Sequence, residues 1–415
     1  MARAIFTTKK LDEVFNYPHK SYPTIHVSGT NGKGSTSSML ASILTEAGYK
    51  VGLFNTPSFR TWNDMIKING VPIPQLRYDE IFNDVKNNAL KNAVYNVSGM
   101  LAMTAFIYFQ QEKVDIAVFE SDLGAATDST GVLTPIVSLL TNITPDHLDR
   151  FGDDFIKYAI EKIGVIKQDT PIYVGETPTN DEVRNLLCNK AKECNANLVL
   201  TDSKENNLIH QENESGHYNT IFGDITISLG GNYQSHNLNL VLNVVKELRT
   251  QGYNISDVHI ISGLNRIYEN TGLCGRWQLL NSKPQIILDC GHNINAWEKI
   301  VPQLLSMKYD NLYIITQMCH DKDVNKITKI FPDEENITYI FPASPIRRLI
   351  NPNCLMHKTR WMGHAKRYTS LSIHSCLTRL CNKLKENDIV FIGGTCKNLH
   401  TVIDEINDIK QKKEW

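Results

Sequence analysis

Apolar residues recur along the first half of the chain in two alternating patterns. Short runs rich in β-branched residues predict strands, and longer amphipathic runs predict helices. The predicted strands are Thr24–Val27, Val51–Asn55, Asp115–Glu120 and Ile136–Asn142. The predicted helices between them are Lys33–Glu46, Gln75–Asn88 and Ser98–Gln110. Alternation of this kind predicts an α/β fold in which helices cover both faces of a mostly parallel sheet.

The pattern changes after Asn197 and resumes after Gly275. Polar strands at Thr220–Phe222 and Ile225–Leu229 predict an antiparallel edge of the first domain. Helices are predicted at Asn237–Thr250 and Ser256–Leu264. The later strands are Gln285–Asp289, Leu312–Gln317, Thr338–Phe341 and Ile389–Gly393, and the later helices are Ala296–Met307, Ser372–Glu386 and Leu399–Ile409. We therefore expect two domains, 1–273 and 274–415, the second being a smaller Rossmann-like α/β unit.

The composition narrows the partners that the chain can have. Its 415 residues suffice for two domains, and 43 basic against 44 acidic residues give no support for nucleic-acid or membrane-surface binding. Nine cysteines without a CxxC pair predict reduced thiols. No apolar run approaches the roughly 18 residues of a membrane span, and none near the start resembles a signal peptide. We expect a cytoplasmic protein.

The run from His26 to Ser35, HVSGTNGKGS, carries the strongest chemical signal. It places a glycine-rich turn between a predicted strand and a predicted helix, where backbone N–H groups can bind phosphate. Lys33 can reach the β- and γ-phosphate oxygens, and the Ser35 hydroxyl can bind Mg²⁺. The predicted nucleotide-binding residues of the loop are Gly29, Thr30, Asn31, Gly32, Lys33, Gly34 and Ser35. A turn without a ligand is the less favoured alternative, although Gly34 departs from the standard phosphate-loop spacing.

Two strand ends deliver further acidic and basic groups to the same sheet edge. Glu120 ends an apolar strand, where parallel sheets bind ligands, and its carboxylate is a natural Mg²⁺ ligand. A solvated strand-end acid is an equally weighted alternative for Glu120 alone. Asp146 and His147 follow the strand Ile136–Leu140 and reach the same edge.

Gly29-Thr-Asn-Gly-Lys-Gly-Ser35 resembles the loop of the Mur ligase superfamily, and most closely that of the folylpolyglutamate synthase/dihydrofolate synthase family. The resemblance recurs in order along nearly the whole chain. The other similar segments are Phe54–Gly70, Glu120–Val132, Thr141–Lys167, Asn232–Asn237, Gly275-Arg276, Asp289–Asn293 and Asp321–Asp323. It implies a P-loop ATPase domain of the Mur-ligase central-domain type followed by the Rossmann-like unit.

The resemblance also implies roles around the metal ions. His147 matches a ligand of a second metal ion, and Ser35 and Glu120 match ligands of the first. Lys162 matches a lysine that the family carbamylates, which turns a cation into an oxygen-donor anion. An ordinary surface lysine is the alternative for Lys162.

Further roles fall on the nucleotide and the amino acid. Asn237 matches an amide on the adenine side, Arg276 can reach phosphate or ribose, and Asp289 would accept from the ribose. His292 would face the phosphate and the incoming amine, and Thr395 matches a hydroxyl near the amino-acid site. A polar turn at a strand end is the alternative for the segment that contains Asp289 and His292.

The implied function is an ATP-dependent ligase that joins glutamate to dihydropteroate, to folates or to both through an acyl phosphate, and releases ADP and phosphate. We expect two Mg²⁺ ions, with a monovalent cation as a further candidate, and a monomer without nucleic-acid or membrane partners. A Mur-type amide ligase acting on a non-folate carboxylate is the alternative. A nucleotide-binding module without catalysis is disfavoured because Lys33, Ser35, Glu120, His147 and Lys162 are all present, and a plain kinase would not need the second domain.

Three departures from the family pattern concern the choice of substrate. Thr56-Pro57-Ser58 lacks the histidine that the family usually has after the second strand. The segment Glu120–Asp128 keeps only Gly124 of several glycines. The stretch before the phosphate loop is short, and we expect it to lack the family's opening helix. A bulkier, acidic loop should admit the acceptor differently.

Overall fold

The computed structural model describes residues 2–146, 151–152, 154–201, 207–212 and 214–412. The larger sheet has eight strands in the order β4-β3-β2-β5-β1-β6-β7-β8. Their bounds are β1 Thr24–Ser28, β2 Val51–Phe54, β3 Ile66–Ile68, β4 Val71–Pro72, β5 Ile116–Glu120, β6 Val137–Leu140, β7 Ile172–Val174 and β8 Leu198–Leu200. Six of them pair in parallel, and β3 and β4 add an antiparallel edge.

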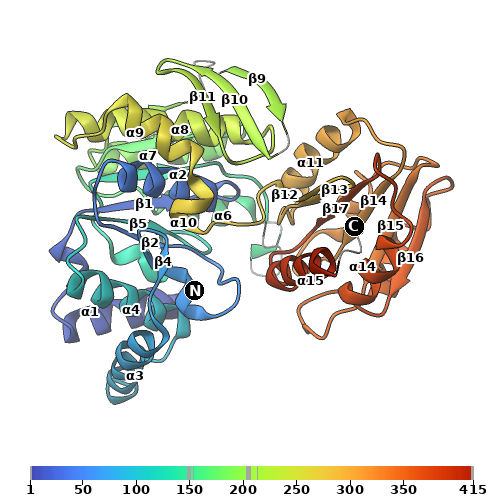
Figure 1. Cartoon of the computed structure of the whole chain (residues 1–415). Helices are drawn as coiled ribbons and strands as arrows, with labels where there is room; N and C mark the ends of the chain where they lie inside the picture. Colours follow the sequence, from blue (N-terminus) through green and yellow to red (C-terminus); the bar gives the residue numbers. More distant parts are fainter. Residues whose placement is uncertain (1, 147–150, 153, 202–206, 213, 413–415) are drawn as a thin grey trace.

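Helices cover both faces of this sheet (Figure 1). Because strand side chains alternate, Ile116 and Val118 of β5 pack on one face, whereas Ala117 and Phe119 pack on the other. The first face carries α2 (Lys33–Glu46), α8 (Gln234–Thr250), α9 (Asp257–Asn265) and α10 (Ile267–Thr271). The second carries α1 (Ala2–Val14), α3 (Gln75–Lys91) and α4 (Val97–Gln111). The helices α6 (Phe155–Ile163) and α7 (Asp181–Glu193) pack together beside β7.

The helix α1 corrects one expectation, because the chain does open with a helix before the phosphate loop. Its buried positions are Thr7, Thr8, Leu11 and Asp12, so the face that packs against α4 is largely polar. Asp12 is bonded to His19 Nδ1 at 2.9 Å in the short helix that follows, η1 (Pro18–Ser21). A helix whose inner face is polar lacks the periodic apolar signal by which helices are recognised.

The predicted antiparallel edge is also different in the structure. The strands β9 (Asn207–Glu212), β10 (Ser215–Thr220) and β11 (Gly223–Ile227) form a separate three-stranded sheet. Tyr218, Ile225 and Ile227 pack into the same core as α8 and α9. The sheet therefore covers the helices of the first unit and is not hydrogen-bonded to its large sheet.

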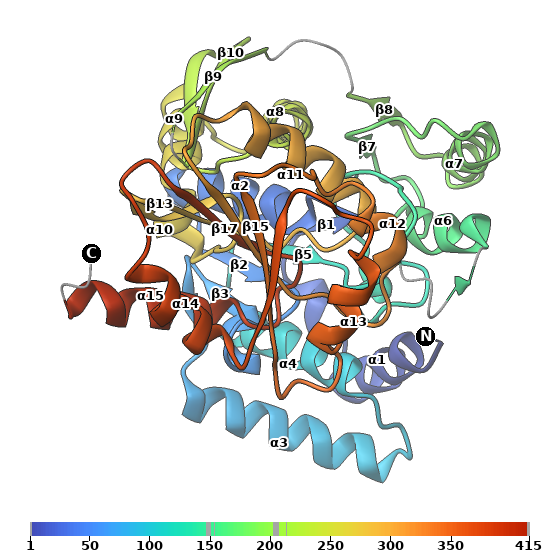
Figure 2. The same ribbon diagram turned by 90° about the vertical axis from the view of Figure 1, so that its right-hand side faces the viewer.

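A six-stranded sheet in the order β12-β13-β17-β14-β15-β16 forms the second unit. It comprises β12 (Gln278–Ser282), β13 (Gln285–Leu288), β14 (Leu312–Thr316), β15 (Ile337–Pro342), β16 (Lys366–Ser370) and β17 (Ile389–Gly393), all parallel except β12. The helices α11 (Ile294–Ser306), α12 (Val324–Thr328) and α13 (Pro352–Lys358) cover one face of this sheet, and α14 (Ile373–Cys381) and α15 (Leu399–Gln411) cover the other (Figure 2).

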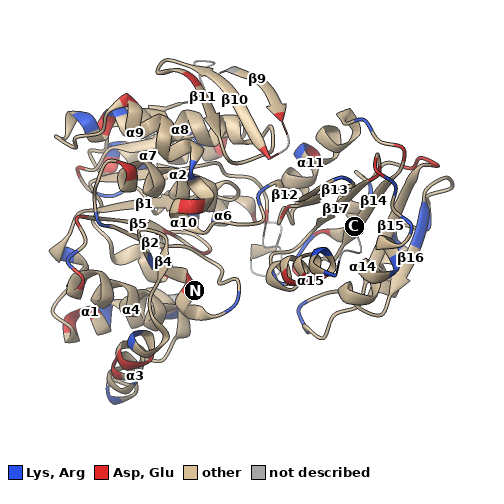
Figure 3. Ribbon diagram, in the orientation of Figure 1, with Lys and Arg blue, Asp and Glu red and all other residues tan. Residues whose placement is uncertain are grey.

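The distribution of charged residues and the state of the cysteines agree with what the composition predicts. Acidic and basic residues are interspersed over both units (Figure 3). All nine cysteines are free thiols. Within the described ranges, no helix has the length and apolar character needed to cross a bilayer.

Candidate active site

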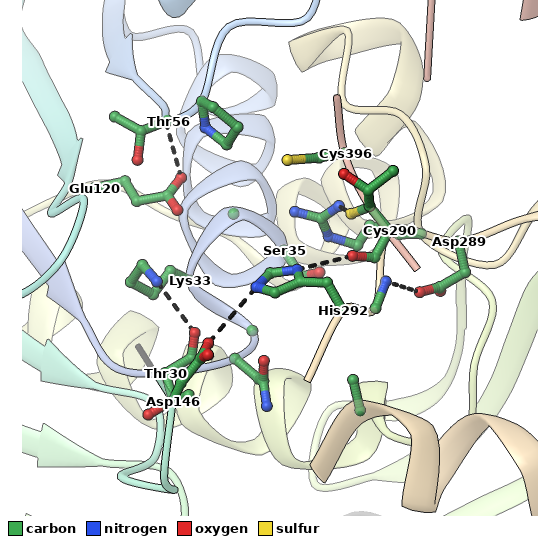
Figure 4. A pocket seen from close by; sticks show the side chains of 18 of the residues that line it. Thr30, Lys33, Ser35, Thr56, Glu120, Asp146, Asp289, Cys290, His292 and Cys396 are labelled. Atoms are coloured by element: carbon green, nitrogen blue, oxygen red, sulfur yellow. Dashed lines mark hydrogen bonds and ion pairs between the residues drawn. The ribbon is translucent and has the colours of Figure 1, made fainter. Parts of the chain in front are cut away.

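A cleft of about 240 Å³ lies where residues of the two units meet. Its walls are loops at the carboxyl ends of parallel strands in both sheets, the position at which such sheets bind ligands. Figure 4 shows side chains of the first unit and of the second directed toward one another across it. The predicted residues that line it are Thr30, Asn31, Gly32, Lys33, Gly34, Ser35, Glu120, Asn237, Arg276, Asp289, His292 and Thr395. Gly29 and Lys162 lie outside the lining, and His147 lies outside the described residues.

The phosphate loop connects β1 to α2, and its glycines are required by close packing. Gly32 has φ +83°, and a Cβ atom there would lie 2.2 Å from Asn237 Oδ1. Gly29 has φ +141°, and its Cβ would lie 1.9 Å from Thr141 Oγ1. The loop therefore leaves the first turn of α2 uncovered, so that its free backbone N–H groups face the cleft. Lys33 Nζ donates to Thr30 O at 3.1 Å.

Oxygen ligands gather beside Lys33. Glu120 is buried, and its carboxylate accepts from Asn55 Nδ2 at 3.0 Å and from the Thr56 N–H at 3.4 Å. Burial raises the pKa of Glu120, and the nearby Lys33 partly opposes that shift. The Ser35 hydroxyl accepts from Gln234 Nε2 at 3.3 Å. A buried carboxylate close to a lysine and a hydroxyl can hold a cation that is itself bound to phosphate.

Asp146 is a further acidic group in the lining, and Lys322 of the second unit bonds it at 2.6 Å. Asn293 Nδ2 also donates to it at 3.0 Å, and His292 Nε2 lies 3.6 Å away. The position of Asp146 at a strand end was visible in the sequence, but its pairing with Lys322 was not. The similar segment Asp321–Asp323 contains Lys322 but does not identify Asp146 as its partner.

Lys162 lies beneath the phosphate loop on α6 with 1% of its surface exposed. Its amine stands over the Tyr158 ring at 5.1 Å, and the Tyr158 hydroxyl bonds Thr30 Oγ1 at 2.9 Å. Burial, and then the charge of Lys33, hold the pKa of Lys162 well below its ordinary value. A surface lysine is therefore excluded, and the amine is held toward its neutral, nucleophilic form.

Two asparagines join the units across the cleft. Asn31 Nδ2 donates to Asn293 Oδ1 at 3.2 Å, and Asn293 Nδ2 donates to Asn31 Oδ1 at 2.9 Å. Asn31 Nδ2 also donates to Asn295 Oδ1 at 3.0 Å. Asn293 is the N-cap of α11, where its Oδ1 accepts from the Ala296 N–H at 3.0 Å. The phosphate loop thus touches the start of a helix in the other unit.

Arg276 and Asp289 line the cleft close to the point where the chain passes from the first unit to the second. Arg276 lies against Gly34, where a Cβ atom would be 3.0 Å from its Nη2. Asp289 is bonded by the Tyr233 hydroxyl, by the Trp277 N–H at 2.9 Å and by the Gly291 N–H at 2.7 Å. Burial raises the pKa of Asp289, and these donors oppose the shift. The carboxylate therefore organises the turn around Arg276 rather than standing free.

The remaining predicted residues have specific partners. His292 Nδ1 donates to the Cys290 carbonyl at 3.0 Å, so its Nε2 faces the cleft and Asp146 (Figure 4). Thr395 Oγ1 accepts from the Lys397 N–H at 3.1 Å. Asn237 donates to Gln234 Oε1 at 2.8 Å beneath Gly32. In this structure Asn237 supports the phosphate loop.

These features define a class: a P-loop ligase, in which a phosphate loop on one α/β unit is covered by polar residues of a second. The Mur ligase middle domain family matches residues 27–245. The dihydrofolate synthase/folylpolyglutamate synthase of Bacillus subtilis is 31% identical over 338 residues, which cover 77% of this chain and 76% of the relative. The chain belongs to the dihydrofolate synthase/folylpolyglutamate synthase family of Mur ligases, and it is an ATP-dependent ligase of that type.

Solved structures agree on the fold. Folylpolyglutamate synthase of Mycobacterium tuberculosis complexed with ADP superposes with a TM-score of 0.83 at 21% identity, covering 99% of this chain and 94% of that one. A bifunctional folylpolyglutamate synthase/dihydrofolate synthase with Mn, AMPPNP and L-glutamate bound gives a TM-score of 0.80 at 22% identity, covering 97% and 94%. The predicted α/β architecture is confirmed.

Proposed function

We propose that the protein joins glutamate to dihydropteroate, to folates or to both, with ATP hydrolysed to ADP and phosphate. The observation that carries the proposal is the convergence of Lys33, Ser35 and Glu120 in a cleft whose opposite wall holds His292. We place the working boundary between units at 273/274. Because the lining residues named above belong to one chain, we propose that the monomer is the active form.

The donor set fits Mg²⁺, since Glu120 is a buried carboxylate and Ser35 a hydroxyl beside the phosphate loop. Ser35 and Glu120 would hold one ion and His147 a second. Bound Mg²⁺ would screen the negative charge of the triphosphate. The manganese bound with AMPPNP and L-glutamate in the bifunctional relative supports this assignment.

Two successive displacements account for the reaction. A carboxylate oxygen of the acceptor attacks the γ-phosphorus of ATP, so that an acyl phosphate forms and ADP leaves. Lys33 offsets the charge that develops on the transferred group. The amine of glutamate then attacks the acyl carbon, phosphate leaves, and His292 Nε2 takes the proton from the amine. The Asn31–Asn293 contact joins the two units, and their closure over the cleft would limit hydrolysis of the acyl phosphate.

Lys162 is proposed to be carbamylated. A neutral lysine amine adds to carbon dioxide to form a carbamate and release one proton, and burial favours the neutral amine. The carbamate would place a carboxylate-like group beneath the phosphate loop, beside Lys33, whose charge would stabilise it. A monovalent cation is a further candidate at such an anionic position.

The residues of the cleft that could contact the acceptor differ from the pattern usual in the family. The loop after β5 brings Asp122 into the lining, and Thr56 sits where the family usually has its Ser-Pro-His segment. We propose that these residues contact the acceptor, which is of the folate type or, in the alternative, a non-folate carboxylate taken by a Mur-type amide ligase. The relatives' names favour the folate type.

The proposal is tested by incubating the purified protein with ATP, Mg²⁺, glutamate and either dihydropteroate or tetrahydrofolate. ADP and phosphate should appear in equal amounts, together with a glutamylated product identified by mass, and AMP should be absent. Lys33→Ala should abolish turnover while circular dichroism stays unchanged. Absence of turnover with every pteroate and folate tested would favour the Mur-type alternative, because its acceptor carboxylate would be missing from the assay.

A further inference from the structure

The β9–β10 hairpin of the small sheet (Figure 1) carries a cluster of potential metal ligands, and none of these residues lines the cleft. His210 and Glu212 are two residues apart on β9, so their side chains leave the same face of the sheet. His217 on β10 is the cross-strand partner of His210. Cross-strand partners on one face bring their side chains within contact distance. The hairpin therefore places three ligand side chains together.

The geometry of the three groups suits one ion. The His210 and His217 rings lie parallel, with centroids 4.2 Å apart and an interplanar angle of 13°. One ligand atom from each of His210, Glu212 and His217 falls within 4.8 Å of the others. His217 Nε2 lies 3.8 Å from Glu212 Oε2. Ligands bound tetrahedrally to zinc at about 2.0–2.2 Å lie roughly 3.4 Å apart, so modest rotation of the exposed His210 and Glu212 side chains toward His217 completes the site.

Thr226 on β11 leaves Nε2 of His217 as the nitrogen that can bind a metal ion. Thr226 on β11 pairs with His217, and its Oγ1 lies 3.0 Å from His217 Nδ1. When Nδ1–H donates to this hydroxyl, the lone pair of the ring is on Nε2. His217 Nε2 is itself buried and has no hydrogen-bond partner among the described residues. Metal-binding histidines are oriented in this manner, by a hydrogen bond from the nitrogen that does not bind the metal.

We propose that His210, Glu212 and His217 form a site for a divalent transition-metal ion such as Zn²⁺. Imidazole and carboxylate donors suit this class of ion, and the fourth position would be open to water because Glu212 is 67% exposed. A stacked histidine pair without a metal is the alternative explanation of the geometry. The ion would tie β9 to β10, next to the turn whose Glu214 accepts from the Leu279 N–H of β12 at 3.1 Å.

The site is tested by titrating the full-length protein with Zn²⁺ in excess Mg²⁺, using calorimetry for affinity and stoichiometry. Co²⁺ is used in parallel because its visible absorption reports tetrahedral nitrogen and oxygen ligation. His217→Ala, His210→Ala and Glu212→Gln should each weaken one binding equivalent at least about tenfold. His374→Ala is the matched control, since His374 is exposed and bonded to Glu405 at 2.6 Å but has no third ligand in the described chain.

Binding of Zn²⁺ to any of the nine thiols is common to all these variants and cancels in the comparison. Glu212→Gln changes one exposed side chain, so a folding defect cannot explain its effect. Wild-type stoichiometry and affinity in all three variants would overturn the proposal, as would an equal loss in His374→Ala. Loss confined to the three hairpin variants, with the tetrahedral Co²⁺ signal lost alongside, would establish it.

Discussion

Asn31 and Asn293, which are 262 residues apart in sequence, exchange two hydrogen bonds across the cleft. Asn31 belongs to the phosphate loop, and Asn293 is the N-cap residue of α11. Each bond contributes about 1 kcal/mol on its own, and both are lost if the units separate. The pair is therefore a direct link between nucleotide binding and the position of the second unit.

Asn293→Asp should reduce kcat/KM by roughly tenfold or more. The aspartate keeps the oxygen that caps α11, but it loses the donors to Asn31 and Asp146 and places a second carboxylate beside Asp146. Steady-state measurement of ADP release checks this. Asn180→Asp is the control, because Asn180 caps α7 through the Val183 N–H in the same way. Equal effects of the two substitutions would mean that only helix capping was disturbed.

Gly32→Ala should abolish ATP binding, whereas Gly48→Ala should not. Both glycines have similar left-handed backbones, with φ +83° and +88°, so the backbone conformation alone should cost each alanine variant roughly 1–2 kcal/mol of folding free energy. Only the Cβ at Gly32 meets another group, Asn237 Oδ1, whereas nothing lies within 4 Å of a Cβ at Gly48. Thermal unfolding and nucleotide titration separate the two effects. Nucleotide affinity retained in Gly32→Ala would contradict the loop geometry.

His26 should make the protein sensitive to acid. It is fully buried in β1, burial lowers its pKa to about 3, and the Lys167 charge adds to the shift. His26 Nε2 donates to Thr130 Oγ1 at 2.9 Å, because the Thr130 hydroxyl itself donates to Asp128 at 2.6 Å. The unfolded chain takes up a proton near pH 6.5, whereas the folded one does not. The stabilisation is therefore complete above pH 6.5 and is lost as the pH falls toward 3.

His26→Gln keeps a side-chain N–H donor for Thr130 but cannot titrate. Between about pH 6 and 4, the wild type should lose about 1.4 kcal/mol of unfolding free energy per pH unit relative to this variant. Urea unfolding at a series of pH values measures the difference. Parallel pH profiles would show that the folded-state histidine takes up its proton normally.

Lys162 should carry a label from ¹³C-bicarbonate as a carbamate resonance. The signal should vanish in Lys162→Ala together with activity, because the buried amine would no longer be there to react. Lys167→Arg is the control: burial also lowers the pKa of Lys167, but its amine donates to the Gly131 carbonyl at 2.8 Å. A resonance that survives in Lys162→Ala and disappears in Lys167→Arg would place the modification elsewhere.

Where local pattern and packing agree, the sequence predicted the fold closely. The helix Lys33–Glu46 and the strand Ile389–Gly393 have the predicted bounds, because buried apolar runs and glycine-rich turns define them. The opening helix α1 was missed because Thr7, Thr8 and Asp12 fill its buried face. Polar burial of that kind depends on a partner such as His19, and a local pattern does not identify the partner.

In the site, residues of one short segment and residues at strand ends were predictable from the sequence, whereas contacts between distant segments were not. The glycines and Lys33 lie in one short segment whose chemistry is local, and the ends of parallel strands pointed to Glu120 and Asp146. The role of Asn237 beneath Gly32 and the Asp146–Lys322 pair follow from how distant segments pack. The role of Asp289 toward the ribose stays a prediction, and the donors that surround it, from Tyr233, Trp277 and Gly291, could not be read from the local sequence.

The Asn31–Asn293 contact also has a consequence during synthesis on the ribosome. The segment with the phosphate loop leaves the exit tunnel long before α11 exists, and first units of a chain generally fold first. A nascent chain stalled near residue 273 would present an open phosphate loop that lacks its opposite wall. Such an intermediate lacks both hydrogen bonds of the Asn31–Asn293 pair, so we expect it to hold nucleotide less tightly than the complete chain does.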